Sequence, residues 1–198
     1  MKTAFLIAGF GMNQTAGDEK YADLQSAIAS KGYKVIPVPF VWNYTTVPQY
    51  VDKFVDFYHQ HRGDHNVIIG NSYGAMVAFL AAPSVLPDEI VLCSLSPYFN
   101  EDKDKTTVEY RVKRFGKRRN KAMDQLHAKQ TATKINQSGT KVIMLYGERE
   151  KLIYPELVER VKSTAQDLHN VKLIEVADAP HSFRDPAYIR GIELALIN

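Results

Sequence analysis

The sequence predicts an α/β fold in which a parallel β-sheet is covered by helices on both faces. Six short apolar runs rich in β-branched residues recur along the chain, at residues 3–8, 34–39, 66–70, 90–95, 141–146 and 172–176. Continuous apolarity over so few residues is typical of strands that are buried on both faces. Segments with helical periodicity separate most of these runs, and strand–helix alternation of this kind favours a parallel sheet.

The helical segments are identified by the spacing of their apolar residues. Residues 51–58 carry apolar side chains at positions i, i+3, i+4 and i+7, and residues 157–168 repeat this pattern. Residues 184–197 are predicted to form a closing helix. Because the chain has 198 residues and 45% of them are hydrophobic, we expect a single domain over residues 1–198.

Two further features of composition bear on the compartment. Cys93 is the single cysteine, which excludes an intrachain disulfide and favours a reducing cytoplasm. The apolar run at the start of the chain is short and lacks a small-residue cleavage site, so a signal peptide is not predicted. No run approaches the ~20 apolar residues that a membrane-spanning helix needs.

The motif that carries the chemistry is Gly70-Asn71-Ser72-Tyr73-Gly74, which has the form G-x-S-x-G. It follows the third predicted strand and precedes an apolar helix. This strand–turn–helix context is required for a nucleophile elbow, where a serine lies in a strained turn and glycines allow backbones to approach closely. The motif therefore predicts Ser72 as a nucleophile; the alternative is a strand–helix turn that merely contains glycines.

A serine hydroxyl needs a base, and His181 is the favoured histidine. It directly follows the last predicted strand, and ligands bind at the carboxyl edge of a parallel sheet. An acidic side chain should orient this histidine. Glu148 and Glu150 follow the fifth strand and Asp178 precedes His181, so chain order leaves all three open. The remaining histidines fit solvated surface or helix ends: His59, His61, His65, His127 and His169.

With these motifs in this order, the chain resembles the α/β-hydrolase superfamily over nearly its whole length. In that family the acid commonly lies three residues after the glycine that ends the penultimate strand, often with a proline a few residues on. Gly147, Glu150 and Pro155 match this frame, so the resemblance implies Glu150 as the triad acid. The family usually has Asp at this position, and Glu is an accepted substitution.

The resemblance also implies an oxyanion hole made of two backbone N–H groups. One donor belongs to Tyr73, the residue after the nucleophile, and the other to Phe10, in the loop after the first strand. Family members often have His-Gly where this chain has Ala8-Gly9. Because the hole uses backbone groups, the absence of that histidine does not remove it.

The family fold implies the order of the strands. The chain begins at what corresponds to the family's third strand, which predicts a minimal three-layer sandwich with a six-stranded parallel sheet in the order 2-1-3-4-5-6. Residues 97–135 are far longer than one crossover needs, and in this family an insertion at this place commonly forms a helical lid. Residues expected to bind substrate are Met12, Trp42, Tyr98 and Phe99.

Positive charge is concentrated in this insertion. Between residues 101 and 134 there are eleven Lys and Arg against five Asp and Glu, a net charge of +6 in a chain whose total is +3. A solvated lid surface is the simplest interpretation. Attraction of an anionic substrate, such as an acyl-phosphopantetheine or a carboxylate ester, is the second. Nucleic-acid binding is the least favoured, because no nucleic-acid motif accompanies the charge.

The leading functional hypothesis is hydrolysis of an ester, thioester or related acyl bond of a small-molecule substrate through an acyl-serine. No cofactor and no metal are expected, and the oligomeric state is left open. One alternative is a carbon–carbon bond hydrolase of the same fold, suggested by Asn71 before the nucleophile. Another is a non-catalytic ligand-binding protein on the hydrolase scaffold, since fold does not fix function.

Overall fold

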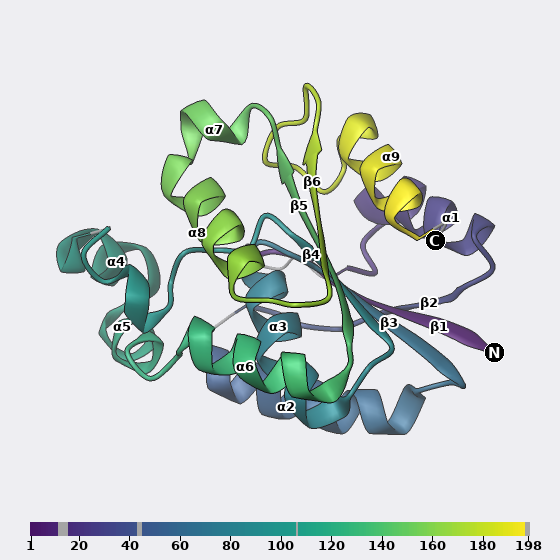
Figure 1. The fold of residues 1–198 in the computed structure, drawn as a ribbon, viewed down its shortest axis with the longest axis horizontal. Coiled ribbons are helices and arrows are strands. Elements are labelled where there is room, and N and C mark those ends of the chain that lie inside the picture. Colours follow the sequence, from purple (N-terminus) through teal and green to yellow (C-terminus); the bar gives the residue numbers. More distant parts are fainter. Residues whose placement is uncertain (12–15, 43–44, 106, 197–198) are drawn as a thin grey trace.

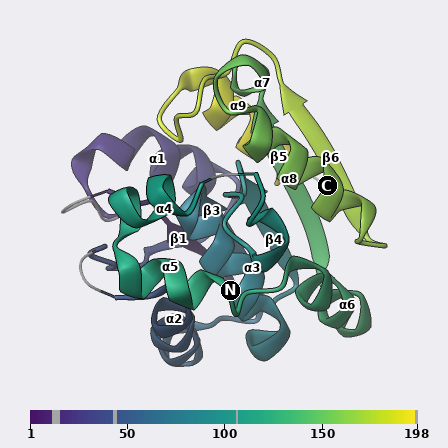
Figure 2. The ribbon, with the colours of Figure 1, turned by 90° about the vertical axis from the view of Figure 1, so that its left-hand side faces the viewer.

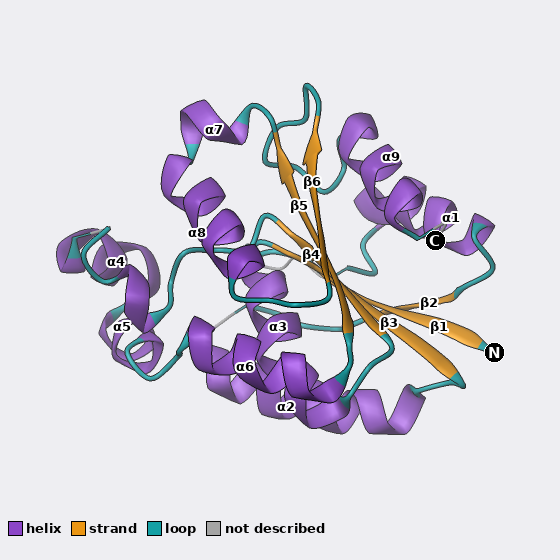
Figure 3. Ribbon diagram, viewed as in Figure 1, coloured by secondary structure: helices purple, strands orange, loops and turns teal. Residues whose placement is uncertain are grey.

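A computed structural model describes residues 1–11, 16–42, 45–105 and 107–196. Its strands form one six-stranded sheet in the order β2-β1-β3-β4-β5-β6, and all neighbouring strands pair in parallel (Figures 1 and 3). The predicted sheet and its strand order are thereby confirmed. The strands are β1 (Lys2–Ile7), β2 (Lys34–Pro37), β3 (His65–Asn71), β4 (Glu89–Cys93), β5 (Lys141–Gly147) and β6 (Val171–Val176).

Helices occupy most of the segments between these strands. They are α1 (Ala22–Ser30), α2 (Val47–His61), α3 (Tyr73–Val85), α4 (Val108–Phe115), α5 (Lys117–Met123), α6 (Ala128–Ser138), α7 (Glu150–Ile153), α8 (Pro155–Gln166) and α9 (Pro186–Ala195). Short 3-10 turns lie at Glu19–Tyr21 and Asn100–Asp102. The closing helix begins at Pro186 because the Asp185 carboxylate caps it, accepting a hydrogen bond from Ala187 N at 2.9 Å.

Two hydrophobic cores lie on the two faces of the sheet. Helices α2, α3, α6 and α8 cover one face, and α1 and α9 cover the other (Figure 1). Because side chains alternate along a strand, Ile68 of β3 packs into the first core while Val67 and Ile69 pack into the second. This burial on both faces explains why the strands read as continuous apolar runs in the sequence.

Two strands end two residues earlier than the sequence predicts. β2 was expected to reach residue 39 and ends at Pro37, and β4 was expected to reach residue 95 and ends at Cys93. Ser94 has φ 53°, in the left-handed region, which takes the chain out of the sheet. This turn aims the Ser94 and Ser96 side chains differently from those of a continuing strand, and both contribute to the site described below.

The segment predicted as an insertion, residues 97–135, divides into two parts. Helices α4 and α5 stand beyond the carboxyl ends of the strands, at the end of the sheet opposite the start of β1 (Figures 1 and 2). In contrast, α6 packs on the sheet, where Ala128, Ala132 and Ile135 are buried in the same core as α3. Thus α6 is the crossover helix from β4 to β5, and we refer to α4 and α5 as the insertion helices.

A buried ion pair fastens the start of this insertion to the core. Asp102 accepts hydrogen bonds from Arg160 of α8 at 2.5 and 3.0 Å, and both side chains are at least 95% buried. Asp102 also accepts from the backbone N–H of Phe99 at 3.1 Å. A buried charge pair needs such additional hydrogen bonds to offset its desolvation.

Within the described residues, no helix combines the length and apolar character needed to cross a bilayer.

Candidate active site

Ser72 lies in a strained turn between β3 and α3. Its backbone has φ 53° and ψ −113°, a combination that non-glycine residues rarely adopt. The flanking glycines are required by close backbone approaches. A Cβ on Gly74 would lie 2.5 Å from the carbonyl oxygens of Ile7 and Ala8, and one on Gly70 would lie 2.6 Å from Gly74 O. The backbone therefore has the geometry expected of a nucleophile elbow.

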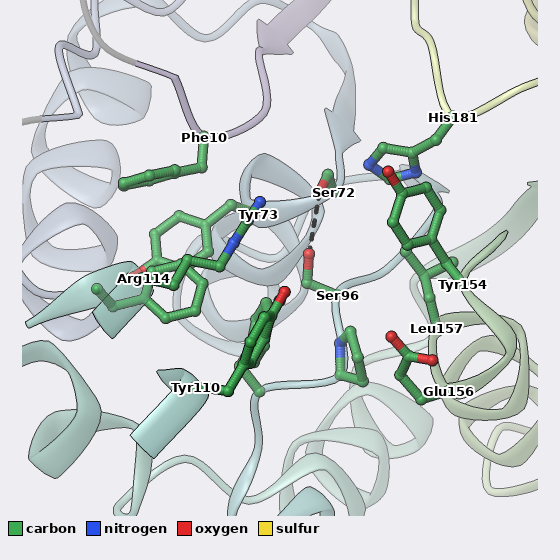
Figure 4. Close-up of a pocket in the computed structure, with 13 residues that line it drawn as sticks. Phe10, Ser72, Tyr73, Ser96, Tyr110, Arg114, Tyr154, Glu156, Leu157 and His181 are labelled. Carbon is green, nitrogen blue, oxygen red and sulfur yellow. Dashed lines mark hydrogen bonds between the residues drawn. The ribbon is translucent and has the colours of Figure 1, made fainter. Parts of the chain in front are cut away.

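The Ser72 hydroxyl faces two adjoining cavities. His181 lines both of them, and its ring faces the Ser72 side chain (Figure 4). The Ser72 hydroxyl also lies 3.0 Å from the hydroxyl of Ser96, which follows β4. The serine is thus held beside an imidazole and a second hydroxyl at the carboxyl edge of the sheet, where ligands bind in parallel α/β folds.

Behind His181 lies Glu150, at the start of α7. His181 Nδ1 is 2.5 Å from Glu150 Oε1. The Glu150 carboxylate is fully buried and accepts two further hydrogen bonds, from Gly147 N at 2.8 Å and from Ser94 Oγ at 2.7 Å. These donors fix the orientation of the carboxylate, as is required of a group that orients an imidazole.

The loops after β5 and β6 contact each other closely, which brings Glu150 to His181. A Cβ on Gly147 would lie 2.3 Å from the carbonyl oxygen of Ala179, so only glycine allows this approach. The N–H of Arg149 donates to the same carbonyl at 3.2 Å. The glycine that ends β5 therefore has a steric role in assembling the site.

The other two acids lie elsewhere. Glu148 and Asp178 are exposed, and the Glu148 carboxylate accepts a hydrogen bond from the backbone N–H of Asp178 at 3.0 Å. Of the three acids that chain order leaves open, the described structure places Glu150 against the imidazole.

The two predicted oxyanion donors lie next to Ser72. Tyr73 is the first residue of α3, and the first N–H groups of a helix have no acceptor within it. Gly9 packs against the elbow so tightly that a Cβ there would lie 3.3 Å from Ser72 Cβ, and this places Phe10 beside the site. The Phe10 ring contacts Tyr73 and Phe115 with centroid distances of 5.4 and 5.5 Å.

The first cavity, of about 90 Å³, is lined by six Phe and Tyr side chains, and we call it the aromatic cavity. Its aromatic lining consists of Phe10, Tyr73, Tyr98, Tyr110, Phe115 and Tyr154. Burial raises the pKa of Tyr98 to about 12, against the opposing effect of the nearby Arg114 guanidinium. The phenol of Tyr98 is therefore a neutral hydrogen-bonding group at any physiological pH.

The second cavity, of about 190 Å³, lies on the other side of Ser72 and His181. Two arginines line it, Arg114 from α4 and Arg184 from the loop before α9, and we call it the basic cavity. The Arg114 side chain extends from α4 toward Ser72 (Figure 4) and also lines the aromatic cavity. The two cavities therefore meet at the serine, the histidine and this arginine.

The residues predicted to bind substrate have different locations. Tyr98 lines the aromatic cavity, whereas Met12 falls outside the described residues. Trp42 and Phe99 are only 1% and 2% exposed and pack in the core, so neither lines the two cavities beside Ser72. Both aromatic side chains support the site from behind, Trp42 through Tyr73 and Phe99 through Phe79.

Several site residues escape prediction from the sequence. Ser94 and Ser96 follow a strand at the edge where ligands bind, a signal that could have identified them. Tyr188 has no such signal: it lies in the closing helix, and its hydroxyl reaches Ser94 Oγ at 2.5 Å. Burial raises the pKa of Tyr188 well above its usual value, which keeps this phenol protonated.

Much of the positive charge of the insertion has internal partners. Arg119 donates to the carbonyls of Thr45 and Trp42 at 2.9 and 3.3 Å, and Arg111 donates to Asn120 and Lys103. These contacts join α5 to the loop before α2 and stabilise the insertion helices. Among the described residues, no group of three His, Cys, Asp or Glu side chains is arranged to hold a metal ion.

The chain matches no protein-family model and no curated protein sequence. Its structure is nevertheless similar to those of known hydrolases. It matches Est1E from Butyrivibrio proteoclasticus, in a structure with ferulic acid bound, with a TM-score of 0.76 and 13% identity. That match covers 99% of this chain and 86% of the other.

Two further solved structures are similar to this chain to a comparable degree. One is to a structure from a study of carboxylesterases of the thaumarchaeon Nitrososphaera gargenis, with a TM-score of 0.71, 13% identity and coverage of 99% and 89%. The other is to a lipase-esterase related protein from Clostridium acetobutylicum, with a TM-score of 0.69, 16% identity and coverage of 98% and 93%. At these identities the likeness establishes the fold: the chain has the α/β-hydrolase fold, as the sequence resemblance implied.

Proposed function

We propose that this protein is a serine hydrolase that cleaves an ester, thioester or related acyl bond through an acyl-serine intermediate. The observation that carries the proposal is the 2.5 Å contact between His181 Nδ1 and the buried Glu150 carboxylate, behind a strained Ser72 that shares both cavities with His181. Nucleophile, base and orienting acid have these roles in serine hydrolases of unrelated folds.

In the acylation step, Ser72 Oγ attacks the carbonyl carbon of the substrate and its proton passes to His181 Nε2. Glu150 stabilises the imidazolium that forms, and the N–H groups of Tyr73 and Phe10 bind the oxyanion. The bond to the leaving group then breaks. The departing oxygen or sulfur takes the proton from His181, which leaves an acyl-serine and a free alcohol or thiol.

Water completes the cycle. His181 takes a proton from a water molecule, whose oxygen attacks the acyl carbon, and the same two N–H groups bind the second oxyanion. Collapse of this intermediate breaks the bond to Ser72 Oγ, which regains its proton from His181. The net reaction consumes one water and yields the acid and the alcohol or thiol. All the groups that it needs belong to the chain.

An active-site label tests this proposal directly. We expect a fluorophosphonate probe to label the wild-type protein, with the adduct found by mass spectrometry on the peptide that contains Ser72. Ser72→Ala should abolish labelling and ester hydrolysis. Ser163→Ala is a matched control, because that hydroxyl lies in α8 and donates to Arg160 O, away from both cavities. Labelling that persists in Ser72→Ala would reject the assignment.

A cytoplasmic location forms part of the proposal. Cys93 is fully buried, and burial raises the pKa of its thiol well above the usual value. A thiol in this state is unreactive, which supports a structural role for the single cysteine.

A further inference from the structure

The basic cavity has a lining that favours negative charge. Arg114 and Arg184 line it together with Asn71, His181 and Ser182, and no Asp or Glu is among its described lining residues. The aromatic cavity differs, because the Glu156 carboxylate lines it along with Arg114. The side of the site that suits an anion is therefore the basic cavity.

Neither arginine is neutralised elsewhere. In the described part of the chain, no carboxylate lies within ion-pair distance of Arg114 or Arg184. Arg114 packs over the ring of Phe115, with its guanidinium carbon 5.6 Å from the ring centroid, and this stacking restricts its side chain. These cations contrast with Arg119 and Arg160, whose guanidinium groups have partners within the fold.

Asn71 adds a polar residue to the wall of the basic cavity, where it is 8% exposed. Its Nδ2 is itself buried and has no hydrogen-bond partner among the described residues. Asn71 therefore contributes a polar, uncharged wall to the cavity, and the charge that favours an anion comes from the two arginines.

Tyr21 indicates the electrostatic field on this side of the site. It lines the basic cavity, and burial raises its pKa while the Arg184 guanidinium lowers it. The nearby Asp18 carboxylate opposes Arg184 but pairs with Lys20 at 3.1 Å. The Arg184 guanidinium therefore lies near the Tyr21 phenol at the wall of the cavity.

We propose that the basic cavity is a subsite for an oxyanion of the substrate, and that the preferred substrate is an ester or thioester bearing a carboxylate or phosphate group. Arg114 and Arg184 bind this group, and the reactive carbonyl lies at Ser72. The substrate class rests on the proposed hydrolase function. Arginine suits this task because its planar guanidinium binds carboxylate and phosphate with paired hydrogen bonds.

Matched esters that differ in charge test the subsite. One pair is 4-acetoxybenzoate and its neutral analogue 4-acetoxybenzamide, with 4-acetoxyphenyl phosphate as the phosphate substrate. A second pair, phenyl 4-carboxybenzoate and phenyl 4-carbamoylbenzoate, places the charge on the acyl side. The readout is the ratio of kcat/KM for the charged ester to kcat/KM for its neutral partner. A comparison of this ratio between variants cancels the intrinsic reactivity of each ester.

We expect Arg114→Gln to lower the ratio about tenfold relative to the wild-type protein in at least one pair, as is typical of a lost charge-assisted hydrogen bond. Arg184→Gln should lower it in the same direction. Lys113→Gln is the matched control, because it removes the same charge from the same helix but lines neither cavity. The anion whose ester loses more kcat/KM in Arg114→Gln, carboxylate or phosphate, identifies the natural anion.

Two results would overturn the subsite: a ratio that stays within about twofold of the wild-type value in both Arg114→Gln and Arg184→Gln, or a ratio that falls as much in Lys113→Gln as in Arg114→Gln. Neither result bears on the proposed hydrolase function, which is measured separately by fluorophosphonate labelling of Ser72 in the wild-type protein. Conversely, absence of that labelling would reject the hydrolase function and with it the substrate class. The two failures are therefore distinguishable.

Discussion

Two regions meet at Ser72, and they are built in opposite ways. Glu150 and His181 follow the carboxyl ends of the neighbouring strands β5 and β6, and the Glu150 carboxylate is fully buried with three hydrogen-bond partners. The insertion helices α4 and α5 stand outside the sheet, and Val108 and Tyr110 of α4 are 59% and 48% exposed. The acid that orients the base is fixed by three hydrogen bonds, whereas the insertion helices present one arginine, Arg114, to the cavities.

This difference indicates a division of labour. Strand ends supply rigid positions, because main-chain pairing fixes them and tight packing leaves no room for rearrangement. Short helices on a connection can vary in sequence without disturbing the sheet. We therefore expect changes around Glu150 to affect chemistry, and changes in the insertion helices to affect stability of their attachment or choice of substrate.

The largest effect should come from the orienting acid. Glu150→Gln is expected to lower kcat about 10³-fold or more, because an amide cannot stabilise the imidazolium and favours the wrong tautomer of His181. Glu148→Gln is the control, since that carboxylate is exposed and contacts the backbone of Asp178. Steady-state kinetics on a simple ester measure both. Equal losses in the two variants would contradict the assignment of Glu150.

The attachment of the insertion should show its effect in stability. Arg160→Met leaves Asp102 buried without its main partner, and we expect the free energy of unfolding to fall by about 3 kcal/mol. The double variant Asp102→Leu with Arg160→Met should recover part of this loss, because it removes the unpaired charge. Urea denaturation measures each change.

An exposed ion pair provides the control for that experiment. Lys31 Nζ lies 3.5 Å from Glu193 Oε1, and both side chains are partly exposed. Lys31→Gln should therefore lower the free energy of unfolding by less than about 1 kcal/mol. If the double variant proved no more stable than Arg160→Met alone, the loss would come from packing rather than from the buried charge.

The smallest effect is expected from the hydroxyls behind Glu150. Ser94→Ala removes the donor to Glu150 Oε1, and we expect kcat to fall about tenfold, the equivalent of one hydrogen bond to a charged group. KM should remain within about twofold, because Ser94 contacts no substrate cavity. A change in KM with kcat unaltered would argue against this positioning role.

Tyr188→Phe extends the same experiment by one residue. The Tyr188 hydroxyl lies 2.5 Å from Ser94 Oγ and donates to Leu145 O at 3.3 Å. In a double-mutant cycle, the effects of Ser94→Ala and Tyr188→Phe on kcat should not add, because both act through the same carboxylate. Simple addition of the two effects would show that they act separately.

The turn at Ser72 could be predicted because its sequence pattern has one local structural role. The strand–turn–helix context is present in the structure, with a φ of 53° at Ser72 and close steric contacts at Gly70 and Gly74. The choice of Glu150 over Glu148 and Asp178 required the residue spacing that is common in the α/β-hydrolase superfamily. Chain order alone could not decide, because all three acids lie between Ser72 and His181 in the sequence. Trp42 and Phe99 were predicted to bind substrate, yet both are buried in the core. The sequence does not show whether an aromatic side chain faces the core or a cavity.

By itself, the sequence determined the parallel sheet, because burial on both faces leaves continuous apolar runs and crossover helices leave 3.6-residue periodicity. The order of the strands followed from the resemblance to the α/β-hydrolase fold. The sequence also determined the elbow at Ser72. Only the tertiary structure decided that α6 belongs to the core while α4 and α5 do not, and that Ser94 and Tyr188 stand behind Glu150. These arrangements depend on contacts between residues up to 94 positions apart, which no local pattern encodes.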